Sequence, residues 1–159
     1  MPTNLYGVND NFDLQSSHVL PAMMRKFHDA KERGRQEVEI WGTGSPRREF
    51  LHVDDLADAC LFLMQHYDAA DHVNIGTGED QTIGDLALMV REVVHPSATI
   101  RFDPSKPDGM PRKLLDVERL HGIGWRHSIR LADGIRSTYA WFLENRAAIE
   151  ATGRATVNA

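Results

Sequence analysis

The stretch REFLHVDDLADA, residues 48–59, decides how the chain folds. Its first half, REFLHV (48–53), is typical of a strand, and DDLADACLFLMQHY (54–67) repeats apolar residues at the spacing of one helix face. A strand that runs directly into a helix is the repeating unit of an α/β protein. Asp54 or Asp55 is expected to cap this helix, because a side-chain carboxylate can accept hydrogen bonds from its first free amides.

His52, Asp54 and Asp55 also raise the alternative of a metal site. Successive side chains of a strand point to opposite faces, so only His52 and Asp54 share a face. No HxxxH or HExxH spacing occurs among the eight histidines. Zinc sites need a fuller ligand set than this, and we therefore expect a strand end and a helix cap, with no metal.

The same alternation extends outward along the chain. Further helices are expected from Ser16 or Ser17 to Gly34, over 82–94 after a Thr82–Asp85 capping box, over 117–124, and over 130–146. Strands are expected over 37–42, 72–76, 98–103 and 113–116, and the proline-rich segment 104–113 should be an extended loop. The predicted fold class is α/β.

Bulk composition excludes several classes of function. The 159 residues are enough for one domain with a core, and a net charge of −5 argues against a nucleic-acid or anionic-membrane binder. No apolar run reaches the ~18 residues of a membrane span, and the N-terminus has no signal-peptide pattern. The single Cys60 excludes an internal disulfide and a multi-cysteine zinc site. These features predict a cytoplasmic location.

Candidates for ligand binding are mostly basic. GTG occurs at 42–44 and 76–78, but neither continues as a dinucleotide-binding fingerprint, so both are interpreted as tight turns. His18 opens a helix and is either a surface residue or a proton donor. Arginine and lysine bind pyrophosphate well, and Trp41 could supply a packing surface. The basic candidates are Arg25, Lys26, Arg47, Arg48, Arg112 and Lys113. For Arg25 the alternative is a solvated helix face.

Several segments together resemble one family. PTNLYG (2–7) is similar to a loop of the extended short-chain dehydrogenases that act on nucleotide sugars. SSHVLPAMMRKFHDAK, WGTGSPRREFLHVDDLADA, HVNIGTGEDQTIGDLA, KPDGMPRKLLD and TYAWFLEN resemble the GDP-L-fucose synthases, in the same order, over residues 2–146. The resemblance implies an NADP-dependent 3,5-epimerase and 4-reductase of GDP-4-keto-6-deoxy-mannose.

The resemblance also implies roles for individual residues. His18 matches the acid of the epimerisation and a cofactor contact. Lys26, Trp41, Arg48 and Asp108 match substrate-binding positions, although Lys26 stands where the family usually has arginine. The loop along NADP would be formed by Pro2, Thr3, Asn4 and Leu5.

What the family has and this sequence lacks is equally informative. No tyrosine is followed four residues later by lysine, and no Gly-rich phosphate turn occurs, so the resemblance is to the C-terminal substrate-binding part, with the Rossmann half missing. We expect a cofactor-side loop region (1–16), a GDP-sugar-binding domain (17–146) and a tail (147–159). The chain is expected to be truncated and inactive alone, and the complete enzyme is expected to be a homodimer. The alternative is a non-catalytic remnant that binds a GDP-sugar or a partner.

Overall fold

The strands form three small groups in the computed structural model, which describes residues 1–157 and the side chains of residues 1–151. β1 (Asn4–Tyr6) pairs in parallel with β4 (Phe50–His52), and β2 (Glu37–Trp41) pairs in parallel with β6 (Thr99–Asp103). The central strand of the third group is β3 (Arg47–Arg48), which lies antiparallel to β5 (Gln81–Thr82) and parallel to β7 (Arg112–Lys113). Parallel pairs joined through helices confirm the α/β class.

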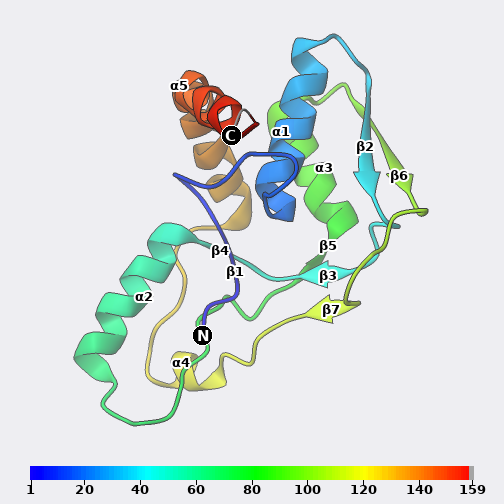
Figure 1. The fold of residues 1–159 in the computed structure, drawn as a ribbon. Coiled ribbons are helices and arrows are strands. Elements are labelled where there is room, and N and C mark those ends of the chain that lie inside the picture. Colours follow the sequence, from blue (N-terminus) through cyan, green and yellow to red (C-terminus); the bar gives the residue numbers. More distant parts are fainter. Residues whose placement is uncertain (158–159) are drawn as a thin grey trace.

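Five helices surround these strands in the described part of the chain. They are α1 (Val19–Glu32), α2 (Val53–His66), α3 (Ile83–Val94), α4 (Glu118–Gly122) and α5 (Leu131–Val157). Helix α3 packs against both α1 and α5, whereas α2 and α4 lie at the opposite end of the molecule (Figure 1).

The β1–β4 pair separates two hydrophobic cores. Tyr6 and Phe50 face the larger core, which contains the buried faces of α1, α3 and α5. Leu51 faces the smaller core with Ile75 and Trp125, and Leu5 packs against it. Alternating strand residues thus serve different cores, as the pleat requires. Both faces of this strand pair are covered, which fixes the position of the polar residues at its ends.

The helix caps differ in part from those expected. The cap of α2 is His52, whose Nδ1 accepts a hydrogen bond from the Asp54 amide at 3.2 Å, so the expectation that Asp54 or Asp55 caps the helix was wrong. Asp55 is buried instead and binds the amide of Ser128 at 3.0 Å. The expected cap of α3 at Thr82 is confirmed, because the Asp85 amide donates to Thr82 Oγ1 at 2.9 Å and that hydroxyl donates to the Asp85 carboxylate at 2.6 Å.

Other element boundaries also moved. The expected strand 48–53 is two strands, β3 and β4, that are interrupted at Glu49. The N-cap position of α1 is His18, not Ser16 or Ser17, and the helix ends before Gly34, which has a left-handed φ of 65°. In place of a strand over 72–76 there is a single bridge between Pro2 and Ile75. Helix α5 continues from Leu131 to Val157 through most of the expected tail, whose residues 158–159 lie outside the described residues.

Candidate functional site

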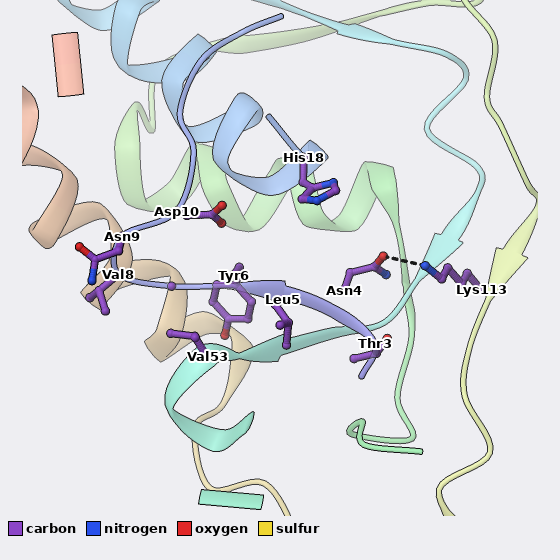
Figure 2. Close-up of a pocket in the computed structure, with 11 residues that line it drawn as sticks. Thr3, Asn4, Leu5, Tyr6, Val8, Asn9, Asp10, His18, Val53 and Lys113 are labelled. Carbon is purple, nitrogen blue, oxygen red and sulfur yellow. Dashed lines mark hydrogen bonds between the residues drawn. The ribbon is translucent and has the colours of Figure 1, made fainter. Parts of the chain in front are cut away.

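A pocket of about 390 Å³ opens beside β1. The walls are the strand itself, the turn that follows it, the first residue of α2, and two basic side chains that come from distant parts of the chain, His18 and Lys113 (Figure 2). Three of the four residues expected on the cofactor side line it, namely Thr3, Asn4 and Leu5. Pro2 is not among the residues that line the pocket, and its backbone is bridged to Ile75.

Asn4 is held in place from two sides. Its Nδ2 donates to the main-chain oxygen of Glu49 at 2.7 Å, and its Oδ1 accepts from Lys113 Nζ at 3.4 Å (Figure 2). The amide orientation is therefore fixed by a donor on one side and an acceptor on the other. Lys113 was among the basic candidates of the sequence but had no assigned place in the site, because nothing in the local pattern shows that the proline-rich loop returns β7 to the end of β1.

The turn after β1 carries the other polar wall of the pocket. Asn9 has a left-handed φ of 63°. The next residue, Asp10, uses Oδ1 to accept from the Asn11 amide at 2.8 Å. His18 stands at the start of α1, where its main-chain oxygen accepts from Ala22 and its side chain makes no cap hydrogen bond. The imidazole therefore lines the pocket and does not cap the helix.

A second cluster of candidates lies at the end of β2. The ammonium of Lys26 stands 4.9 Å from the ring centroid of Trp41 and donates to the Glu39 carbonyl at 3.2 Å. Lys106 approaches the same ring at 5.7 Å. Burial lowers the pKa of Lys26, while the nearby Glu39 carboxylate opposes that effect. Trp41 remains 59% exposed, so its ring is a cation-flanked surface that is open to solvent.

Asp108 fixes the proline-rich loop over that surface. Its Oδ1 accepts from the amide of Thr43 at 2.6 Å, and its Oδ2 accepts from Thr43 Oγ1 at 2.7 Å. Gly42 makes this approach possible, since it has a φ of 84° and a Cβ there would collide with the Asp108 carboxylate. Asp108 therefore ties the loop to the turn next to Trp41.

Arg48 connects this cluster to the pocket. It pairs in register with Lys113, whose ammonium reaches Asn4. On its other side the guanidinium Nη2 lies 3.6 Å from where a Cβ of Gly109 would be. The expected residues thus follow one another from the pocket through Lys113 and Arg48 to the loop at Asp108, and then to Trp41 and Lys26.

Two of the basic candidates have a structural role instead. Arg47 Nε and Arg112 Nε both contact the Asp80 carboxylate, at 2.8 Å and 2.5 Å. These contacts hold β3 against β7 and lower the pKa of Asp80, with the Arg112 hydrogen bond as the largest cause. The charges of Arg47 and Arg112 are therefore shared with one carboxylate, which leaves Arg48 and Lys113 as the cations nearest the pocket.

Among the described residues, no group of three or more histidine, cysteine, aspartate or glutamate side chains is arranged to hold a metal ion. Within the same residues, no helix is both long and apolar enough to cross a membrane.

Comparison with known proteins shows which proteins this chain resembles over most of its length. Residues 1–76 match the NAD dependent epimerase/dehydratase family. GDP-L-fucose synthase 1 of Arabidopsis thaliana is 57% identical over 145 residues, which are 91% of this chain and 45% of that protein. The chain is related to the GDP-L-fucose synthases. The GDP-L-fucose synthase of Escherichia coli strain K12 is 50% identical over 155 residues, 92% of this chain and 48% of that protein.

Solved structures give the same result. A GDP-L-fucose synthetase from Naegleria fowleri has a TM-score of 0.86 at 30% identity and covers 92% of this chain, which in turn covers 45% of that structure. The same enzyme is known bound to NADP. The expected resemblance to the GDP-L-fucose synthases is confirmed, and the chain spans a little under half the length of the curated relatives that it matches.

Proposed function

We propose that this chain is the GDP-sugar-binding part of an NADP-dependent epimerase and reductase that converts GDP-4-keto-6-deoxy-mannose to GDP-L-fucose. The observation that carries the proposal is the continuous series of side chains from His18 and Asn4 to Trp41. A nucleotide sugar is elongated, with a reacting sugar at one end, a pyrophosphate in the middle and a base at the other. The series offers a titratable group, then two cations, then an aromatic surface.

In this proposal the sugar lies in the pocket beside His18. Epimerisation next to a ketone needs removal of a proton from one face of the carbon and its return from the other. His18 is the donor, because its imidazole lines the pocket and can carry an N–H proton. Asn4, whose amide is already oriented by Glu49 and Lys113, contacts the cofactor together with Thr3 and Leu5. NADP, when bound, supplies the hydride for the 4-reduction.

The pyrophosphate is assigned to Arg48 and Lys113. They are neighbours on adjacent strands, and neither carries a carboxylate partner among the contacts found in the described residues. Trp41 and Lys26 take the guanosine end. Asp108 accepts two hydrogen bonds from Thr43, and because each carboxylate oxygen has a second lone pair it can still accept one from a sugar hydroxyl.

The proposal also covers the oligomeric state and the cellular location that the family resemblance implies. We expect the active form to be a homodimer and the location to be cytoplasmic. A GDP-sugar-binding protein without catalysis is the alternative, and it differs only in the absence of turnover.

A chimera tests the proposal directly. In the chimera, the part of the Escherichia coli relative that lies outside the region shared with this chain is joined to residues 1–159 of this chain. NADPH oxidation with GDP-4-keto-6-deoxy-mannose and binding of GDP by calorimetry are both measured. Turnover with GDP binding supports the proposal, and GDP binding without turnover supports the alternative. A folded chimera that binds no GDP contradicts both.

A further inference from the structure

Asp10 has a carboxylate oxygen that no group in the described residues uses. Oδ1 accepts from the Asn11 amide at 2.8 Å, whereas Oδ2 is buried and has no hydrogen-bond partner there. A buried acceptor without a partner is energetically unfavourable. The residue lines the same pocket as His18, and its carboxylate is turned toward the side on which the imidazole lies (Figure 2).

The backbone before Asp10 is shaped for this placement. Asn9 is the one non-glycine residue with a left-handed φ among the described residues. Such a conformation is unfavourable for most side chains and tolerated by asparagine. It turns the chain directly after β1, so that Asp10 faces the opening of α1 instead of continuing along the strand.

A carboxylate beside His18 would fix the orientation of its imidazole. His18 occupies the N-cap position of α1, and its side chain makes no cap hydrogen bond. The ring is therefore not oriented by the helix that it starts. A carboxylate that accepts a hydrogen bond from one ring nitrogen fixes which nitrogen faces the reactant.

We propose that Asp10 is the positioning residue of His18: Oδ2, which has no partner in this structure, accepts a hydrogen bond from one ring nitrogen when the imidazole turns toward it, so that the other nitrogen presents its proton to the pocket. The inference rests on the proposed function, because it assigns a positioning residue to His18, the proposed acid of the epimerisation. No proton passes to Asp10: His18 gives its proton to the substrate carbon and takes another from solvent afterwards.

The charges around the pair are consistent with this role. Burial raises the pKa of Asp10, and the Asn11 amide and the charge of His18 lower it. The other charged group that lines the pocket is Lys113, whose ammonium is directed to Asn4. Asp13, the next carboxylate along the chain, is already engaged by the amides of Gln15 and Ser16 at 3.0 Å each. Asp10 is thus the carboxylate of this turn with a free buried oxygen.

The first test needs no activity. Carbon-13 NMR of the chimera follows the titration of the Asp10 carboxyl carbon in the parent and in His18→Asn. The expected result is a higher pKa for Asp10 in His18→Asn, because the positive charge that lowers it has been removed. His72→Asn removes an exposed histidine elsewhere and should leave the titration unchanged. An unchanged pKa in His18→Asn contradicts the pairing, whether or not the chimera is active.

The second test separates positioning from general structure. Exchange of the sugar C3 and C5 protons into solvent is followed by NMR across pH for Asp10→Asn, Asp10→Glu and the exposed control Asp68→Asn. We expect Asp10→Asn to slow exchange by about 10-fold or more, a part of the ~10²–10⁴-fold effect of a general acid. It should also move the pH profile, and Asp10→Glu should restore part of the rate. A parent without exchange refutes the proposed function, whereas a normal parent and an Asp10→Asn variant with an unchanged profile refute only the Asp10 role.

Discussion

The buried carboxylate of Glu49 accepts a hydrogen bond from the amide of Gly78 at 2.8 Å. The same side chain accepts from the amides of Thr77 at 2.7 Å and Leu115 at 3.1 Å, and it is fully buried. Its main-chain oxygen meanwhile holds Asn4. One residue between β3 and β4 therefore joins the turn at 76–78, the segment after β7 and the pocket, with main-chain amides in place of a cation.

Replacement of Glu49 by glutamine should destabilise the protein. The side chain keeps its shape, but the amide nitrogen then faces at least one main-chain N–H that previously had an acceptor. Loss of that hydrogen bond and burial of an unsatisfied donor cost roughly 1–3 kcal/mol. Urea denaturation of Glu49→Gln measures the change, with Glu79→Gln as the control, because Glu79 loses the same charge at an exposed site of the same loop. Equal effects of the two changes would contradict the role of the buried carboxylate.

Asp80 should make stability depend on acidity. The arginine contacts lower its pKa from the ordinary 3.8, so the unfolded chain binds a proton before the native one does. The stabilisation is present above pH 3.8 and is lost as the pH falls through the native pKa. Asp80→Asn should therefore lower the stability at pH 6. It should also reduce the loss of stability on acidification, as measured by urea midpoints at pH 6 and below pH 3.8. Asp68→Asn should keep the parent dependence, and an Asp80→Asn variant that also keeps it would disprove this explanation.

His28 gives a similar test, near neutral pH. It lies on the buried face of α1, and its Nδ1 lies 3.0 Å from the hydroxyl of Tyr139 in α5. Burial is the largest cause that lowers its pKa, Arg146 and Arg25 act in the same direction, and Glu32 and Asp29 oppose them. A lowered histidine pKa means that the unfolded state takes up the proton first, so stability is lost as the pH falls below the ordinary 6.5. Melting temperatures at pH 7.5 and 5.5 should differ less in His28→Gln than in the parent.

Much of this fold was predictable from the sequence because its signals are local. Apolar spacing at Leu20, Met24 and Phe27 predicts α1, and these residues are buried in the larger core. Thr82 and Asp85 predict the start of α3 because both halves of a capping box lie within one turn.

The errors came from long-range contacts. A carboxylate at the start of a helix is usually a cap, but Asp55 turns inward to bind the amides of Ser128 and Ile129, which lie far along the chain. His52 caps in its place. Similarly, Lys113 enters the pocket only because β7 pairs with β3, and no short pattern in the sequence encodes that pairing.

Gly42 should control the loop that carries Asp108. A methyl group at Gly42 would collide with the Asp108 carboxylate, and its φ of 84° is unfavourable for alanine. Gly42→Ala should therefore break the hydrogen bonds to Thr43 and weaken GDP binding by the chimera, measured by calorimetry. Gly122→Ala is the control, because nothing lies within 4 Å of a Cβ there. Affinity that is the same in both variants would mean that the Asp108 loop does not contribute to the site.

Arg48 offers the sharpest test of the binding site. It lies between Lys113 and the Gly109 backbone, and its guanidinium is held by a 2.8 Å hydrogen bond to the Arg47 carbonyl. If it binds the pyrophosphate, Arg48→Ala removes a charge-assisted hydrogen bond worth about 1.5–3 kcal/mol, which is roughly a 10- to 150-fold loss of affinity for GDP. Guanosine, which has no phosphate, should lose much less.

The matched control for Arg48 is Arg130→Ala, at an exposed arginine just before α5. The Lys26→Arg variant is expected to bind GDP at least as tightly as the parent, because a guanidinium can donate two parallel hydrogen bonds where an ammonium acts as a point charge. Calorimetry of all three variants with GDP and guanosine separates the cases. If Arg48→Ala and Arg130→Ala bind GDP equally well, Arg48 only ends a strand, and the pyrophosphate must be assigned to Lys113 alone.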